Sequence, residues 1–222
     1  MKKHILCIGD SNTHGYCAES YDCADGGDRF NEEERWTCLL GNQLDDSYLV
    51  LEEGLGGRTT VFNDPLTEGM SCLDVIFPIM MSHKPIDLLI IMLGTNDTKE
   101  RFCVSAECIG AGLERLVNKA KSINAWKDNL PNILLIAPPH ILPEMYVGPF
   151  SGTMGANCAE KSRQLATVYK AVANRTDCHF LDAEGIAEFN KTDGMHLTKK
   201  GHAALAAHLA SIIPKLVNKH EE

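Results

Sequence analysis

The chain has 222 residues, of which 44% are hydrophobic, and this is enough for one large domain with a buried core. We therefore expect residues 1–222 to form a single domain. The formal net charge of −9 would repel nucleic acids and anionic membrane surfaces, so we expect neither as a partner and favour a small-molecule substrate.

The cysteines and the N-terminus indicate the compartment. Nine cysteines, an odd number without a C-x-x-C pair, predict free thiols rather than a disulfide framework or a zinc ribbon. The apolar stretch at the N-terminus covers about four residues, which is too short for a signal-peptide core or a membrane span. We predict a cytoplasmic protein.

Short apolar runs alternate with longer amphipathic segments along the chain. The expected strands are residues 5–8, 48–51, 87–93, 132–137 and 178–181. The expected helices are residues 33–44, 71–81, 105–121, 158–173 and 199–217. Parallel strands need crossover connections, which pack as helices, so this alternation predicts an α/β fold with a parallel sheet covered on both faces.

The expected strand 87–93 is apolar without alternation, which is typical of a central strand buried on both faces. Two irregular stretches, 17–31 and 138–155, are rich in glycine with acidic residues and in glycine with proline, respectively. Ligands of open parallel sheets bind beyond the carboxyl ends of the strands. We therefore expect the reactive side chains shortly after the strands and the two stretches to build the substrate pocket.

Ser11 follows the first strand at a turn into a helix, which would expose its hydroxyl and place its N–H at a helix N-terminus. A serine hydroxyl needs a base to become a nucleophile, and His196 is our candidate. Asp193, separated from it by Gly194 and one further residue, could fix the tautomer of the imidazole and stabilise its positive charge. The predicted catalytic set is Ser11, Asp193 and His196.

A tetrahedral intermediate also needs donors for its oxyanion, each contributing roughly 3 kcal/mol in comparable sites. The candidates are the N–H groups of Ser11 and Gly57 and the side-chain amide of Asn96. Gly56 remains an alternative to Gly57, which we prefer because it directly precedes Arg58.

These residues lie in four blocks: Gly9-Asp10-Ser11, a glycine after the second strand, Gly94-Thr95-Asn96-Asp97, and Asp193-x-x-His196. Their order resembles that of the SGNH, or GDSL-type, hydrolases over nearly the whole chain. The resemblance implies a flavodoxin-like three-layer α/β/α fold, with a five-stranded parallel sheet of order 2-1-3-4-5. It also implies esterase, thioesterase, lipase or acetylesterase activity.

Segments around these blocks, including 35–37, 52–60 and 91–99, look most like the arylesterase and acyltransferase branch of the family. That resemblance suggests small acyl groups and allows a homo-oligomer. Asn12 stands where the family usually has leucine, and we interpret this as a change in helix packing or pocket polarity.

The favoured function is a serine esterase that hydrolyses short-chain carboxylic esters, of aryl or acetylated carbohydrate type, through an acyl-enzyme at Ser11. One alternative is an acyltransferase that passes the acyl group to an alcohol. Another is a flavodoxin-like module that binds a phosphate or nucleotide, although G-x-x-x-x-G-K-S/T is absent. We expect no cofactor and no metal, because the sequence lacks H-E-x-x-H and any clustered Cys/His set.

Further side chains are expected near the site or on its supports. Asp10 should hydrogen-bond the loop backbone rather than react, and Thr198 should cap the last helix, on which His202 and His208 would be surface or packing residues. The candidate substrate contacts are His14, Tyr16, His140 and Phe150.

Overall fold

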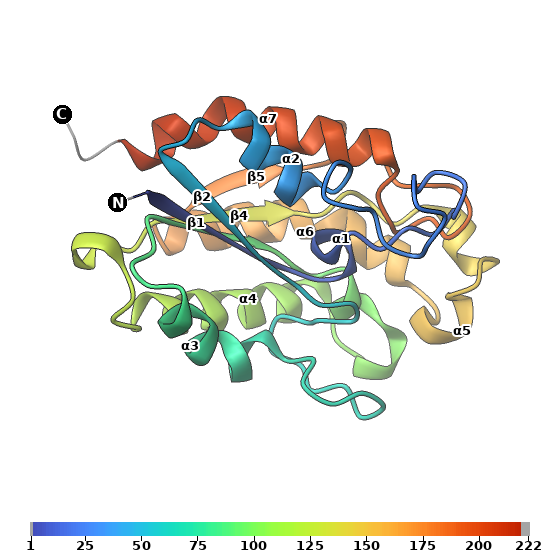
Figure 1. The fold of residues 1–222 in the computed structure, drawn as a ribbon. Helices are drawn as coiled ribbons and strands as arrows, with labels where there is room; N and C mark the ends of the chain where they lie inside the picture. Colours follow the sequence, from blue (N-terminus) through green and yellow to red (C-terminus); the bar gives the residue numbers. More distant parts are fainter. Residues whose placement is uncertain (1, 219–222) are drawn as a thin grey trace.

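A computed structural model describes residues 2–218 and contains one sheet of five parallel strands in the order β2-β1-β3-β4-β5 (Figure 1). The strands are β1 (Lys3–Gly9), β2 (Tyr48–Gly54), β3 (Leu88–Met92), β4 (Ile133–Ala137) and β5 (His179–Asp182). The predicted fold class and strand order are confirmed.

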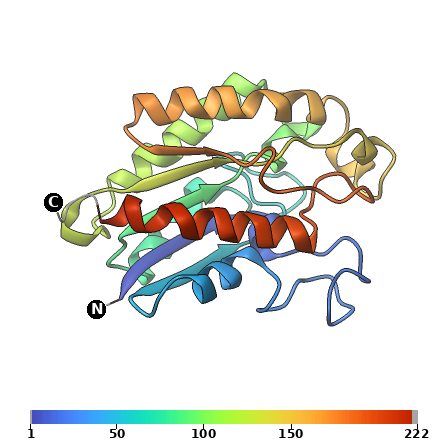
Figure 2. The ribbon, with the colours of Figure 1, turned by 90° about the horizontal axis from the view of Figure 1, so that it is seen from above.

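Helices cover both faces of the sheet. On one face lie α3 (Cys72–Ser82), α4 (Ala106–Lys121) and α6 (Cys158–Arg175), and on the other lie α2 (Trp36–Gln43) and α7 (Lys199–Val217), which crosses the sheet in Figure 2. Alternate residues of each central strand enter the two cores. Leu89 and Ile91 of β3 pack toward α3, α4 and α6, whereas Leu88 and Ile90 pack toward α2 and α7. Burial on both faces explains the unbroken apolar run.

The helix ends reflect local hydrogen bonding. The hydroxyl of Thr198 accepts a hydrogen bond from the N–H of Gly201 at 2.9 Å and caps α7, as expected. The first predicted helix is corrected: α2 begins at Trp36 rather than at residue 33. Its start is delayed because the buried Glu34 carboxylate accepts hydrogen bonds from the N–H groups of Ala24 and Asn31, which holds the preceding residues in turns.

Short helical turns connect these elements, mostly at the carboxyl ends of the strands. They are α1 (Ser11–His14), η1 (Asn96–Thr98), η2 (Glu100–Phe102), η3 (Lys127–Asn129), η4 (Pro143–Tyr146) and α5 (Ser151–Met154). Stretch 17–31 and α5 lie at the same end of the molecule in Figure 1.

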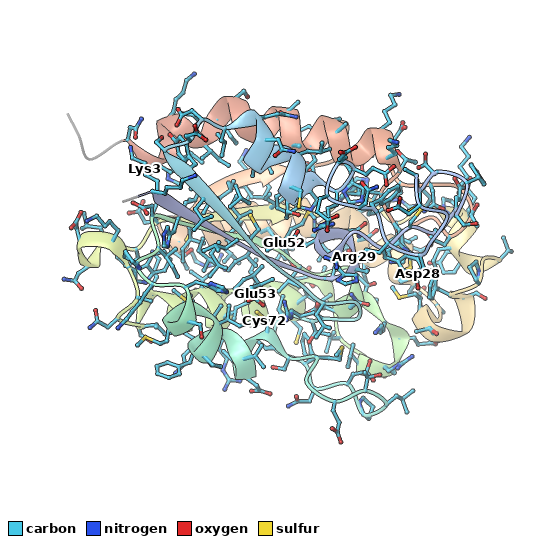
Figure 3. All side chains as sticks on the ribbon, in the orientation of Figure 1. Lys3, Asp28, Arg29, Glu52, Glu53 and Cys72 are labelled. Carbon is cyan, nitrogen blue, oxygen red and sulfur yellow. The ribbon has the colours of Figure 1, made fainter. Side chains whose placement is uncertain are left out.

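Stretch 17–31 is anchored to the sheet through Arg29. Figure 3 shows Arg29 beside Glu52 of β2, and the two side chains approach to 3.7 Å. The Arg29 Nε–H also donates a hydrogen bond to the carbonyl of His14 at 2.8 Å. These contacts fix the stretch next to the end of β1.

His202 of α7 is fully buried against α2, where its Nδ1 accepts a hydrogen bond from the N–H of Trp36 at 3.2 Å. Burial lowers the pKa of His202 to about 3. The ring is therefore a neutral packing group near neutral pH. Among residues 2–218, none of the helices has the length and apolarity that crossing a membrane requires.

Candidate active site

The first strand delivers Ser11 to the carboxyl edge of the sheet. β1 ends at Gly9, and Asp10 caps the short helix α1 by accepting a hydrogen bond from the N–H of Asn12 at 2.9 Å. Burial raises the pKa of Asp10 to about 6. Asp10 thus bonds the loop backbone, as expected, and leaves the Ser11 hydroxyl at the start of the helix.

Ser11, His196 and Asp193 converge at this edge. The Ser11 Oγ lies 2.8 Å from His196 Nε2, and His196 Nδ1 lies 2.7 Å from Asp193 Oδ2. All three side chains are buried. The imidazole therefore touches the hydroxyl with one nitrogen and the carboxylate with the other, the arrangement that proton transfer from a serine nucleophile requires.

The Asp193 carboxylate is held in place by further donors. Its Oδ1 accepts hydrogen bonds from the Asn190 side-chain amide at 2.9 Å, from the Met195 N–H at 3.0 Å and from the His196 N–H at 3.1 Å. Burial by itself would raise the pKa of Asp193, but these bonds and His196 outweigh it and the pKa lies below its ordinary value. The carboxylate stays ionised. Asn190 was not predicted as a site residue, although its proximity to Asp193 in the chain was an available signal.

Asn12 connects the two halves of this arrangement. Its Oδ1 accepts a hydrogen bond from the Leu197 N–H at 2.9 Å, and its Nδ2 donates one to the Met195 carbonyl at 3.1 Å. Asn12 is almost fully buried and does not line the cavity next to Ser11. The asparagine in place of leucine thus ties α1 to the segment that carries His196.

A tight turn follows β2 and presents two glycines to Ser11. The Arg58 N–H donates a hydrogen bond to the Leu55 carbonyl at 3.1 Å, and Gly57 has φ +88° at the third position of this turn. That φ favours glycine, as in a type II turn. Gly56 and Gly57 both line the cavity.

Asn96 comes from the end of β3 and lines the same cavity, 3% exposed. Its Nδ2 donates a hydrogen bond to the Arg58 carbonyl at 3.2 Å. The adjacent Asp97, whose pKa burial raises to about 6, accepts a hydrogen bond from the Thr60 N–H at 2.9 Å. Two of the candidate oxyanion donors, Gly57 and Asn96, thus lie on segments that are hydrogen-bonded to each other.

The cavity beside Ser11 has a volume of about 200 Å³. Tyr16 and Phe150 line it as expected, with ring centroids 4.5 Å and 5.5 Å from that of His196. The other two candidate contacts lie elsewhere. His14 is outside the lining, and His140 lines a separate cavity together with Glu184.

Four lining residues were missed by sequence analysis: Lys99, Thr153, Met154 and Met195. Met195 adjoins His196 and Lys99 follows the block of Asn96, so proximity in the chain was a signal for these two. Thr153 and Met154 belong to stretch 138–155, for which only the general expectation of a pocket wall was available. Within residues 2–218, no group of His, Cys, Asp or Glu side chains is placed to hold a metal ion.

Comparisons with known proteins identify the family of the chain. Residues 7–204 match the family described as GDSL-like lipase/acylhydrolase. The chain belongs to this family. It is a carboxylic ester hydrolase, which confirms the predicted enzyme class and speaks against a phosphate-binding module. Among curated proteins no match was found.

Solved structures of esterases are similar over almost the entire chain. An aryl esterase from M. smegmatis is 33% identical, with a TM-score of 0.86 over 96% of this chain and 99% of that one. A carbohydrate acetylesterase from Sinorhizobium meliloti is 32% identical, with a TM-score of 0.87 over 97% of this chain and 100% of that one. The predicted resemblance to the SGNH hydrolases is confirmed.

Proposed function

We propose that this enzyme hydrolyses short-chain carboxylic esters through an acyl-enzyme at Ser11. The observation that carries the proposal is the continuous contact from the Ser11 hydroxyl through the imidazole of His196 to the Asp193 carboxylate. No separate activating group is needed, because the base already contacts both the nucleophile and the carboxylate that orients it.

In the first half of the reaction, Ser11 Oγ bonds to the ester carbonyl carbon while its proton moves to His196 Nε2. The carbonyl oxygen becomes an oxyanion and accepts hydrogen bonds from the Ser11 and Gly57 N–H groups and the Asn96 amide. The bond between the carbonyl carbon and the leaving oxygen then breaks. His196 gives its proton to that oxygen, and the alcohol departs.

In the second half, water attacks the acyl carbon and passes one proton to His196. The bond between that carbon and Ser11 Oγ breaks, and His196 returns the proton to the serine oxygen. The products are the free acid and the regenerated enzyme. Asp193 remains ionised throughout and stabilises the imidazolium.

The cavity supports short acyl groups combined with aryl or acetylated carbohydrate alcohols. A volume of about 200 Å³ is below the range of about 300–1,000 Å³ typical of drug-sized ligands. Tyr16 and Phe150 offer aromatic rings to an aryl leaving group. The solved relatives act on aryl esters and on acetylated carbohydrates, according to their names.

The test is turnover of 4-nitrophenyl acetate together with mass analysis of acid-quenched enzyme, both intact and after digestion into peptides. Wild type should carry the mass of one acetyl group on the peptide that contains Ser11. Ser11→Ala should lose this adduct and lower kcat by roughly 10³-fold or more. Ser122→Ala, at an exposed serine after α4, should retain both. A Ser11→Ala enzyme with the wild-type rate would refute the proposal.

A second candidate is transfer of the acyl group to an alcohol. It is favoured by the side chains of Phe150, Met154 and Met195, which line the cavity and give an alcohol with an apolar part more contact than water. The two outcomes differ in product. At a fixed alcohol concentration, transfer predicts more new ester than free acid, whereas an excess of acid that persists across several alcohols would contradict it.

A further inference from the structure

Asp64 is a buried carboxylate outside the catalytic set. It lies between β2 and α3, and its side chain is 1% exposed. Its Oδ1 accepts a hydrogen bond from the Leu66 N–H at 3.0 Å, and two cations share the carboxylate: Lys99 Nζ at 3.3 Å and Arg101 Nη1 at 3.1 Å. A buried charge is costly unless its partners satisfy it. Here two cations and one N–H group do so, and they join Asp64, Lys99 and Arg101 in one cluster.

Arg101 connects this cluster to α5. While Nη1 pairs with Asp64, Nη2 donates a hydrogen bond to the Thr153 carbonyl in α5 at 2.8 Å. The neighbouring Glu100 accepts a hydrogen bond from the Ala156 N–H at 3.0 Å. A guanidinium can make both bonds at once because its donors form a rigid planar fork. The turn η2 is therefore bonded to the C-terminal part of α5 and to the residue just beyond Gly155.

The α5 region forms one side of the active-site cavity. Phe150, Thr153 and Met154 all line it, together with Ser11. A four-residue helix has too few internal hydrogen bonds to hold its own position, so its placement depends on neighbouring groups. Met154 also packs in a small buried cluster, which fixes the inner side of α5. The contact of Arg101 fixes its outer side.

We propose that Asp64 and Arg101 are positioning residues that hold α5 against the cavity and thereby limit the size of the ester that enters beside Ser11. The inference rests on the proposed esterase function. Neither side chain lines the cavity. Arg101 acts through the placement of Thr153 and its neighbours, and Asp64 acts through Arg101 and through Lys99, which lines the cavity.

The test compares substrate size profiles rather than a single rate. For wild type, Arg101→Met and Asp64→Asn, kcat/KM is measured with 4-nitrophenyl esters from acetate to octanoate and with acetates of increasingly large alcohols. We expect the ratio of the large to the small substrate, in at least one of the two series, to rise by roughly 10-fold in both variants, since a relaxed wall admits additional methylene groups.

Two further variants make the result specific. Arg101→Lys retains the positive charge but lacks the fork that reaches both partners, so its ratio should lie between those of wild type and Arg101→Met. If Arg101→Met is too unstable to purify, the ratio measured for Arg101→Lys tests the proposal in its place. Arg175→Met removes a more exposed arginine–carboxylate pair, with Glu114 at 2.7 Å between α4 and α6, and should leave the ratio unchanged.

A uniform change across all esters, with the wild-type ratio preserved in both series, would overturn the inference. Failure of the wild type to hydrolyse any ester would instead contradict the proposed function. The two failures are thus separable, because one is measured on the wild-type enzyme and the other on a ratio between substrates.

Discussion

The Asn12 side chain bonds the main chain on both sides of His196: it accepts a hydrogen bond from the Leu197 N–H at 2.9 Å and donates one to the Met195 carbonyl at 3.1 Å. Because Asn12 directly follows Ser11, this amide fixes the position of the imidazole relative to the hydroxyl. We therefore expect the contact of 2.8 Å between Ser11 Oγ and His196 Nε2 to depend on it.

Replacing this amide should therefore impair the chemical step. Asn12→Leu, which introduces the residue usual in the family, should lower kcat by about 10- to 100-fold with little change in KM, since small displacements of reacting groups have effects of this order. Steady-state kinetics with 4-nitrophenyl acetate measure both kcat and KM. Asn118→Leu, on the exposed face of α4, is the matched control, and unaltered kcat in Asn12→Leu would show that other contacts set the distance.

Asp193→Asn tests the role of the carboxylate. An amide at this position can be isosteric but favours the wrong imidazole tautomer, and kcat should fall on the order of 10⁴-fold. Far-UV circular dichroism should be unchanged. Asp74→Asn, at an exposed site on α3, should behave as wild type. A loss of less than about tenfold would mean that the carboxylate does not govern the imidazole.

Asn96→Ala tests stabilisation of the oxyanion. Loss of one such donor typically lowers kcat by about 10²- to 10³-fold, and KM should stay close to the wild-type value because the donor acts mainly in the transition state. The variant also loses the hydrogen bond to the Arg58 carbonyl, so its melting temperature should be recorded. A rise in KM with constant kcat would instead identify Asn96 as a substrate-binding group.

His202 should make stability fall toward acidic pH. Its pKa is lowered by burial to about 3, so between about pH 6.5 and pH 3 the unfolded chain binds a proton that the folded chain does not. The free energy of unfolding therefore has its full value above about pH 6.5 and decreases as the pH falls, by up to about 1.4 kcal/mol per pH unit. At neutral pH, His202→Leu should be less stable by about 1–3 kcal/mol, because the Trp36 N–H loses its acceptor.

The measurable quantity is the difference in unfolding free energy between wild type and His202→Leu, from urea titrations at several pH values. It should shrink steadily on acidification. Asp10 and Asp97, whose raised pKa values act in the opposite sense, occur in both proteins and cancel in the difference. A difference independent of pH would contradict the prediction.

The elements of the fold could be predicted because apolar runs and amphipathic segments report burial directly. The strand order came from the family resemblance. The convergence of Ser11, Asp193 and His196 followed from their positions after strands, since parallel strands bring their carboxyl ends to one edge. His14 does not line the cavity, because its imidazole is hydrogen-bonded to the backbone of Gly54 at the end of β2.

The residues of the cavity wall were harder to predict from the sequence. Thr153 and Met154 take their positions from contacts with residues distant in the chain, such as the hydrogen bond from Arg101 to the Thr153 carbonyl. No local pattern encodes such a contact. Asn190 likewise acts through a turn whose hydrogen bonds become visible only in three dimensions.

The segment from Asn190 to Leu197 closes on itself. The Asn190 side chain bonds both Asp193 and the His196 carbonyl, and Asp193 in turn bonds the main chain and the imidazole of His196. His196 and Asp193 consequently form one preassembled unit. A movement of this segment relative to α1 would change the distance from His196 to Ser11 while leaving the contact between His196 and Asp193 intact, so activity would fall and recover with that one distance.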